Sequence, residues 1–363
     1  MCYEPPVTRA DPSFVVDTVS WRDFCALLSS PVLSADLGGS AGGALIVRGA
    51  PAAGDPLDLP VGAVEAARQL PVVVVLDAPV AEPVGDSSSN LTGGLVGDLP
   101  AGSEVVDLIA SGDDLELVVE QVVTRPHAAT ALALLLRSSE ERSVFDGLAA
   151  ESAVYSTLQG GSEFRQWRRQ NPRRDRPAPD VPAVLVGRRG DVLDIVLNRP
   201  EVRNALDARM RDELWDALLV AAADPALTVH WSGAGPSFCS GGDLDEFGSV
   251  SDPASGHLIR LSRSLGLAIH RVADRTTAHV HGACAGSGIE LPAFAGTVVA
   301  APDARFSLPE LQLGLIPGAG GTVSLPRRIG RHRTLWLALT GRVVDADTAL
   351  AWGLVDRIDP PED

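Results

Sequence analysis

The stretch that decides the fold is His281-Gly282-Ala283-Cys284-Ala285-Gly286-Ser287-Gly288-Ile289-Glu290, a glycine-rich turn between two apolar segments. A short β-rich run around Ala278-His279-Val280 precedes it, and apolar residues from Ile289 to Ala295 follow it. A second glycine-rich turn, Gly233 to Gly242, follows a strand pattern at 228–231. This repeated order of strand, glycine turn and helix predicts an α/β fold with parallel strands, whose site lies in the loops at the strand ends.

Outward from these turns, the C-terminal half continues the same alternation. Val192 to Leu197 is a β-rich run, and Met210 to Ala222 carries apolar residues at helical spacing. A further helix is expected from Leu258 to Ala273 and a further strand from Thr297 to Ala301.

The N-terminal half, roughly 1–165, is less regular. Two apolar runs, 44–47 and 72–76, predict buried strands with a helix at 61–70 between them, and residues 80–103 are typical of a loop. Two amphipathic helices are expected from Leu115 onward, the first interrupted near Pro126 and the second running from Val144 to about Leu158. This half is therefore expected to be a degenerate α/β or mostly helical unit.

The clearest break in composition runs from Arg165 to Pro182, where six arginines are mixed with four prolines. Such a segment is typical of an exposed linker, and it could also receive the phosphate groups of a ligand. The resulting expectation is a unit at 1–170 with closing helices at about 115–168, a linker at 171–183 and a catalytic domain at 184–363.

Composition excludes several classes of function. The 363 residues carry a net charge of −17 with 45% apolar residues, a globular composition that allows two domains or one large one. All 30 basic residues are arginine, so Schiff-base chemistry on lysine and the GK[ST] phosphate loop are excluded. The acidic excess also disfavours nucleic-acid binding.

The distribution of cysteine and of apolar residues bears on location. Four cysteines stand without CxxC spacing, which favours reduced thiols over a zinc site or a disulfide framework. The first residues lack the pattern of a signal peptide, and no long uncharged apolar stretch follows. The expectation is a soluble, cytoplasmic protein without a membrane partner.

The two glycine-rich turns can offer backbone N–H groups to a developing oxyanion, because small residues let a ligand carbonyl approach the main chain. Two carboxylates stand in apolar surroundings nearby in sequence, Glu290 and Glu310. An isolated glutamate in an apolar stretch either forms a pair or has a raised pKa, as a general acid or base requires. The sequence therefore offers both an oxyanion site and a pair of acid/base candidates.

Five motifs in order make residues 184–363 resemble the crotonase superfamily of enoyl-CoA hydratases and isomerases. They are Leu197-Asn198-Arg199-Pro200 with Asn204-Ala205-Leu206, Phe238-Cys239-Ser240-Gly241-Gly242-Asp243-Leu244, Gly314-Leu315-Ile316-Pro317-Gly318-Ala319-Gly320-Gly321-Thr322, Leu339-Thr340-Gly341, and Ala351-Trp352-Gly353-Leu354-Val355. The resemblance implies a ββα superhelix in this half, a homo-oligomer that is a trimer or hexamer, and an acyl-CoA substrate with no separate cofactor.

The resemblance also implies roles for single residues. Ser240 and Ser287 would supply the two oxyanion amides, and Glu290 and Glu310 would be the acid and base of water addition to a 2-enoyl-CoA. The coenzyme A pocket would be lined by Arg203, Ala205, Ser240, Gly241, Gly242, Asp243 and Leu244. Another crotonase reaction, such as isomerisation, thioester hydrolysis or cofactor-free oxygenation, remains an alternative, as does a non-catalytic acyl-CoA-binding or scaffold protein.

Three weaker patterns point elsewhere. Gly282-Ala283-Cys284-Ala285-Gly286 fits a cysteine version of the nucleophile elbow. His279 and His281 have the spacing of two metal ligands on one strand, without an evident third. The glycine loop at 233 lacks dinucleotide spacing, so NAD is not expected.

The order of the segments is unusual for this family. Members normally continue into closing helices beyond the GLV motif, whereas this chain has eight residues after Val355. Residues 115–172 resemble that missing tail. We hypothesise that residues 20–170 are a degenerate second copy whose helices cover the intact site, the alternative being an unrelated helical extension.

Overall fold

A computed structural model describes residues 15–29, 42–49, 59–60, 62–78, 103–174 and 180–359. The expected loop at 80–103 lies outside these residues apart from its last position.

The C-terminal half is built on a six-stranded sheet in the order β13-β10-β8-β7-β6-β5. All neighbours in it are parallel except the hairpin of β5 and β6, and alternate residues of β6 are buried, so one face of this strand packs on the core. A three-stranded sheet in the order β12-β11-β9 lies beside it. The strands are β5 (Val184–Arg189), β6 (Val192–Leu197), β7 (Thr228–Gly233), β8 (Thr276–Val280), β9 (Ala283–Ala285), β10 (Thr297–Ala300), β11 (Arg305–Ser307), β12 (Val344–Asp345) and β13 (Arg357–Ile358).

Helices follow most of these strands. They are α8 (Ala208–Ala223), α9 (Pro253–Ser262), α10 (Leu265–His270), α11 (Ser287–Glu290), α12 (Gly321–Thr340) and α13 (Ala346–Trp352). The predicted α/β fold is thus confirmed. The prediction of a single helix from Leu258 to Ala273 is wrong, because the structure has two helices there. The chain leaves helical geometry at Arg263, and the Ser264 side chain caps the next helix by accepting a hydrogen bond from the Leu267 amide.

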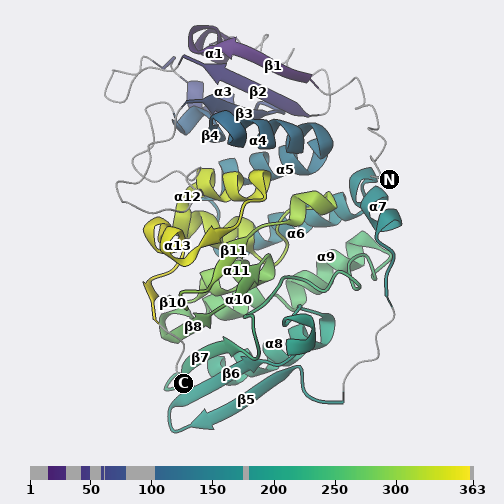
Figure 1. The fold of residues 1–363 in the computed structure, drawn as a ribbon, viewed down its shortest axis with the longest axis vertical. Helices are drawn as coiled ribbons and strands as arrows, with labels where there is room; N and C mark the ends of the chain where they lie inside the picture. Colours follow the sequence, from purple (N-terminus) through teal and green to yellow (C-terminus); the bar gives the residue numbers. More distant parts are fainter. Residues whose placement is uncertain are drawn as a thin grey trace, which may run out of the picture.

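The N-terminal residues form a separate parallel sheet in the order β1-β2-β3-β4. Its strands are β1 (Val15–Ser20), β2 (Gly43–Arg48), β3 (Val73–Asp77) and β4 (Leu108–Ala110). Helices α1 (Trp21–Leu28) and α3 (Ala63–Arg68) share a buried apolar cluster with one face, and the other face belongs to the main core. Figure 1 shows this sheet at one end of the molecule and β5 to β7 at the other.

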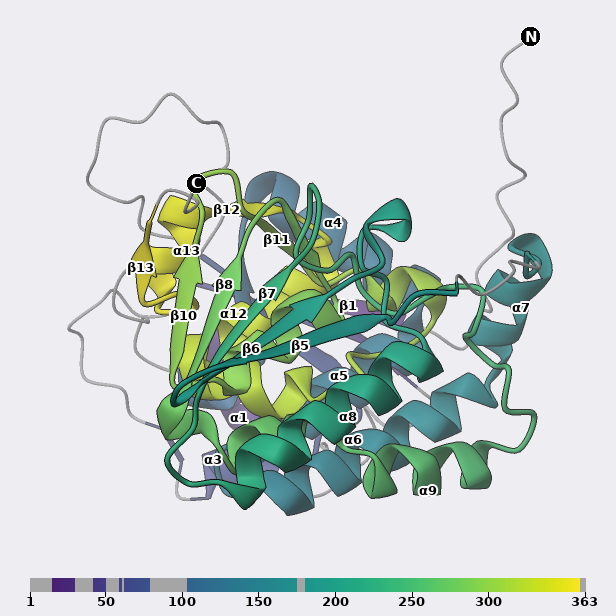
Figure 2. The ribbon, with the colours of Figure 1, turned by 90° about the horizontal axis from the view of Figure 1, so that it is seen from below.

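Between the two sheets lie four helices from the first half of the chain: α4 (Gly112–Thr124), α5 (Pro126–Arg137), α6 (Val144–Gln159) and α7 (Ser162–Gln170). Helix α5 begins at Pro126, whose missing N–H costs nothing at the first helical position. Helix α6 packs against α9, and Figures 1 and 2 both show these two helices side by side. One buried apolar cluster runs through β3, α5, α6, β6 and α12, so both halves share a core.

Polar contacts also join the halves. The indole N–H of Trp336 donates to the Asp114 carboxylate at 3.0 Å, and the Arg342 guanidinium donates to the same group at 2.6 Å. His332 Nδ1 lies 2.9 Å from the Asp107 carbonyl oxygen, and burial lowers the pKa of this imidazole to about 4. Helix α12 is therefore fixed to the N-terminal sheet as well as to the C-terminal half.

The Arg165–Pro182 segment is only partly a linker. Residues up to Gln170 belong to α7, so the first arginines are helical, and the structure describes 171–174 and 180–183 as irregular chain. The unit expected at 1–170 and the idea of a degenerate second copy stay predictions.

Candidate active site

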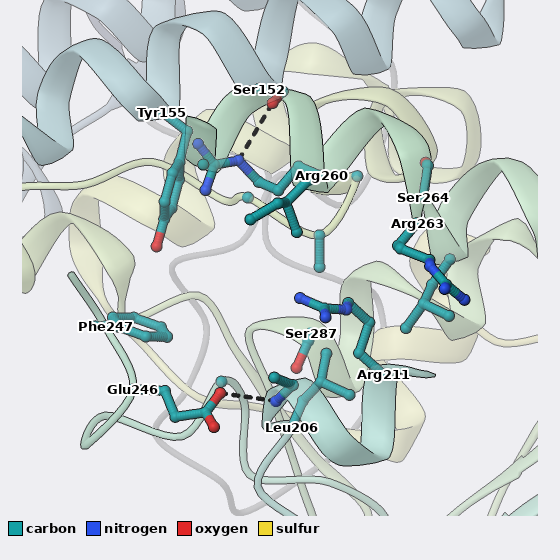
Figure 3. Close-up of a pocket in the computed structure, with 18 of the residues that line it drawn as sticks. Ser152, Tyr155, Leu206, Arg211, Glu246, Phe247, Arg260, Arg263, Ser264 and Ser287 are labelled. Atoms are coloured by element: carbon teal, nitrogen blue, oxygen red, sulfur yellow. Dashed lines mark hydrogen bonds between the residues drawn. The ribbon is translucent and has the colours of Figure 1, made fainter. Parts of the chain in front are cut away.

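A cavity of about 370 Å³ lies where the C-terminal loops meet α6. Its walls come from α6, the start of α8, the loop at 242–250, α9 and α10, the start of α11, and the loop before α12. Figure 3 shows Tyr155, Ser152 and Arg260 together on one side, with Ser287 and Leu206 away from them. The cavity thus combines residues from both halves of the chain.

The two predicted glycine turns lie directly against each other. The Phe238 amide donates to the His281 carbonyl at 2.8 Å, and the Ala285 amide donates to the Cys239 carbonyl at 3.1 Å. A Cβ atom on Gly288 would lie 2.0 Å from the Cys239 carbonyl oxygen, so only glycine allows this approach. Both turns therefore contribute to one site.

Ser287 begins α11 and lines the cavity. Within the described residues its amide donates to no protein group, as expected for a first helical residue. Gly286 before it has φ +50°, and a Cβ there would lie 2.2 Å from Glu310 Oε1. The turn thus presents the Ser287 N–H to the cavity beside the Glu310 carboxyl group.

Ser240 does not occupy the predicted role. Its amide donates to the Arg203 carbonyl at 3.0 Å, so this N–H is already used by the protein. Two residues later, Gly242 lines the cavity. Leu206 bonds the residues on either side of Gly242, through the Gly241 carbonyl and the Asp243 amide, each at 2.8 Å. Because successive amides of an extended segment point to opposite sides, the Gly242 N–H points away from Leu206, and it donates to no protein group among the described residues.

Glu290, the last residue of α11, is buried at 2% exposure and lines the cavity. Its Oε2 accepts hydrogen bonds from the amides of Ala319 at 2.8 Å and Gly321 at 2.9 Å. Burial raises the pKa of this carboxyl to about 7, while these amides oppose the rise by stabilising the charged form.

Glu310 lies on the same cavity and is also buried. Its Oε2 has no hydrogen-bond partner among the described residues. Burial, and then the nearby Glu290 charge, raise the pKa of Glu310 well above its usual range. The two predicted glutamates thus share one cavity but have different surroundings: the amides of Ala319 and Gly321 hold Glu290, whereas Oε2 of Glu310 has no such partner among the described residues.

A third carboxylate comes from α6 and is absent from the predicted site. Glu151, 2% exposed, accepts hydrogen bonds from the Gly320 amide at 2.7 Å and from the Thr322 amide at 2.9 Å and hydroxyl at 2.7 Å. Burial and the Glu290 charge raise the pKa of Glu151 to about 8. A glutamate on the apolar side of the helix expected at 144–158 was the only sequence signal for it.

Only some of the residues predicted to line the coenzyme A pocket lie on this cavity. Gly242 and Asp243 line the cavity, whereas Arg203, Ala205, Ser240, Gly241 and Leu244 are not among its lining residues. Arg203 is exposed in a left-handed conformation with φ +53°, and Asp243 forms an ion pair with Arg199 at 3.1 Å. The arginines that line the cavity are instead Arg211, Arg260 and Arg263.

Two arginines of the 165–182 segment contact the loop beside the cavity. Arg168 donates to the carbonyls of Leu244 and Phe247 at 2.6 and 2.9 Å, and Arg174 pairs with Asp245 at 3.3 Å. They fix the loop beside the cavity.

The weaker patterns find no support. Cys284 is fully buried, and burial raises the pKa of its thiol well above the usual range, the opposite of an activated nucleophile. No cluster of three or more metal-ligating side chains occurs in the described ranges. Among the helices of those ranges, none combines the length and hydropathy of a bilayer-spanning segment.

Comparison with known proteins agrees with the fold and the motifs. A family model described as enoyl-CoA hydratase/isomerase matches residues 187–363. A Rhizobium meliloti protein named as a probable enoyl-CoA hydratase is 37% identical over 182 residues, 49% of this chain and 69% of that protein. Carnitinyl-CoA dehydratase of Proteus mirabilis is 34% identical over 182 residues, 47% of this chain and 65% of that protein. The crystal structure of an enoyl-CoA hydratase from Thermoplasma volcanium is 34% identical with a TM-score of 0.47, covering 50% of this chain and 73% of that one.

The C-terminal half thus has the α/β crotonase fold, as predicted. The chain belongs to the enoyl-CoA hydratase/isomerase family. It spans about two thirds of the length of these relatives, which match only its second half.

Proposed function

We propose that the protein adds water reversibly across the 2,3-double bond of a 2-enoyl-CoA thioester. One observation carries the proposal: the buried carboxyl groups of Glu290 and Glu310 line the same cavity as Ser287 and Gly242, whose amides are free. Water addition needs a base, an acid and a group that stabilises the enolate between the two steps. Groups suited to all three roles line this cavity.

The different surroundings of the two glutamates indicate which one acts as the base and which as the acid. Glu290 is the base, because two amide hydrogen bonds favour its carboxylate and its pKa of about 7 suits proton uptake at neutral pH. Glu310 is the acid, because burial without a partner for Oε2 favours its neutral form. Like charges so close together also favour one ionised and one protonated carboxyl.

The reaction then proceeds in two proton transfers. Glu290 takes a proton from water as the water oxygen bonds to carbon three, and the double-bond electrons move onto the thioester oxygen. The amides of Ser287 and Gly242 stabilise this enolate oxygen, each by about 3–4 kcal/mol in comparable sites. The enolate electrons return to form a bond between carbon two and the Glu310 proton.

The charges around the cavity indicate where the coenzyme A part of the substrate binds. Arg211 and Arg263 line the cavity near α8 and α10 and offer cationic groups to the phosphates of coenzyme A. The Ser287 side chain leaves the cavity open. The alternative hypothesis of a non-catalytic protein with a blocked pocket therefore has no support in the geometry. The cytoplasmic location and the trimeric or hexameric assembly remain predictions.

The test is hydration of crotonyl-CoA by the wild type, Glu290→Gln and Glu310→Gln, with exposed Glu201→Gln as the control. Each cavity variant is expected to lose roughly 10²-fold or more in kcat, and the control none. Product mass separates hydration, a gain of one water, from isomerisation without mass change and from release of free coenzyme A. Turnover unaffected by either cavity substitution contradicts the proposal.

A further inference from the structure

Arg260 of α9 places a partly buried guanidinium on the cavity wall without a carboxylate partner. Its Nε donates to the Ser152 hydroxyl at 3.2 Å, and an Nη donates to the Ser156 hydroxyl. The guanidinium carbon lies 4.6 Å from the centre of the Tyr155 ring. These three partners are neutral. The Glu151 carboxyl also acts electrostatically on Arg260, but its pKa is raised to about 8, so it is mostly protonated at neutral pH, and no ion pair of Arg260 occurs within the described residues.

The other two arginines of the cavity differ in this respect. Arg211 pairs with Asp212 at 2.9 Å, and Arg263 lies 3.9 Å from the Asp216 carboxylate. A cation withdrawn from water beside hydroxyls and an aromatic ring keeps most of its charge uncompensated, and such a charge costs stability unless an anion completes it. Arginine has five N–H donors, so several remain for a ligand after the two serine contacts.

The position of Arg260 follows from the groups around Tyr155. A Cβ on Gly318 would lie 2.5 Å from the Tyr155 ring, so the ring packs on the loop whose next amide, that of Ala319, holds Glu290. Arg260 stacks on the same ring. It therefore lies beside the loop that positions the acid/base pair.

This position lies on the acyl side of the site. With the thioester oxygen at Ser287 and Gly242, carbons two and three must reach Glu290 and Glu310. The acyl chain beyond carbon three then continues toward the wall formed by Tyr155 and Arg260. Figure 3 shows Arg260 beside Tyr155 and Ser152, with Arg263 and Ser264 in another part of the cavity.

We infer that Arg260 binds a carboxylate at the far end of the acyl chain, so that the preferred substrates are monothioesters of α,β-unsaturated dicarboxylic acids. This inference rests on the proposed function and names its substrate class. A carboxylate suits the planar fork of donors and completes the unpaired charge. An acyl chain ending in a cation is disfavoured at the same position.

The experiment compares two substrates of equal chain length, trans-pent-2-enoyl-CoA and the monothioester of trans-pent-2-enedioic acid, together with the same pair one carbon longer. The wild type is expected to favour the dicarboxylic thioester in kcat/KM by at least tenfold at one of the two lengths. Arg260→Gln is expected to lose this preference, and Arg260→Lys to keep part of it. Arg263→Gln is the matched control, because a group on the coenzyme side weakens both thioesters by the same factor.

Outcomes for the two proposals are separable. Hydration of the uncharged thioester without a preference for the dicarboxylic one overturns the role of Arg260 and leaves the proposed function standing. If neither thioester is hydrated, calorimetric binding of the saturated pair, glutaryl-CoA and pentanoyl-CoA, still decides. Tighter binding of glutaryl-CoA that Arg260→Gln abolishes supports the role, and equal binding of both overturns it.

Discussion

Glu151 and Glu290 accept hydrogen bonds from interleaved backbone amides at the start of α12. Glu290 takes the amides of Ala319 and Gly321, and Glu151 takes that of Gly320 between them. The two side chains come from opposite halves of the chain, α6 and α11. The start of a helix carries partial positive charge, which favours both carboxylates, yet their mutual repulsion opposes double ionisation. The protonation of the site therefore depends on the N-terminal half.

The first prediction concerns the pH dependence of hydration. The base must be ionised, and the pKa of Glu290 is raised to about 7, so kcat/KM is expected to rise as pH increases through about 7. The acid must be protonated, and the pKa of Glu310 is raised well above its usual range, so the rate falls again at higher pH. Initial rates on crotonyl-CoA from pH 5 to 10 measure this profile. A rate that is flat from pH 5 to 8 contradicts the assignment of Glu290.

The second prediction concerns Glu151→Gln. The pKa of Glu151 is raised to about 8, above that of Glu290 at about 7, so Glu151 still holds its proton while Glu290 ionises. Replacing it by the neutral glutamine should therefore leave the rising limb of the profile in place, as should Glu201→Gln, an exposed change of the same chemistry. A rising limb that moves to lower pH in Glu151→Gln alone would show that Glu151 ionises before Glu290 and contradict this order.

The third prediction concerns stability. The pKa of Glu151 is raised in the folded protein to about 8, so the folded state holds a proton that the unfolded state releases near pH 4.5. Its contribution is complete below the unfolded pKa and is lost as pH rises toward 8. One pKa unit corresponds to about 1.4 kcal/mol. Between pH 5 and 8 the wild type should therefore lose a few kcal/mol more of its free energy of unfolding than Glu151→Gln loses, as measured by urea titration.

Sequence patterns located most of this site because its parts are local. Glycine turns at strand ends and glutamates in apolar runs are visible in the chain, so Ser287, Glu290 and Glu310 were placed on one cavity as expected. The choice between Ser240 and Gly242 was not visible. It depends on which amide the bridge between Leu206 and Gly242 leaves free, and that is a property of pairing between distant segments.

The contribution of the N-terminal half was less predictable. The apolar runs at 44–47 and 72–76 indicated strands, and the helices from 115 onward were expected, but their partners are set by tertiary packing. In the sequence, Glu151 is indistinguishable from an ordinary helical residue. Its role becomes visible only when α6 packs against the start of α12. Its partners lie 169 and 171 residues away in sequence, beyond the reach of any local pattern.

The fourth prediction tests the contact between α6 and the loop before α12. Gly318→Ala would place a methyl group 2.5 Å from the Tyr155 ring and force the two apart. Overpacking of this kind costs about 1–3 kcal/mol, and here it also displaces the loop that holds Glu290. We expect lower stability and a lower rate of hydration. Gly187→Ala is the control, since a Cβ there meets nothing within 4 Å; equal effects of the two substitutions would contradict the contact.

The last prediction concerns the ion pair that joins the N-terminal sheet to α5. Arg137 donates to both Asp107 carboxylate oxygens at 2.6 and 2.8 Å, and to the Leu70 and Val72 carbonyls at 2.5 and 2.6 Å. Arg137→Met leaves the buried Asp107 charge with only the more distant Arg331 guanidinium, at 4.0 Å, so we expect a loss toward the lower end of about 3–5 kcal/mol in the free energy of unfolding.

The exposed pair of Arg48 and Asp77 is the matched control, because water already solvates it. Arg48→Met should cost less than about 1 kcal/mol. Denaturant unfolding of both variants measures the difference. A small loss in Arg137→Met would mean that water or rearrangement replaces the pair, and that the sheet is held to the helices by its apolar face alone.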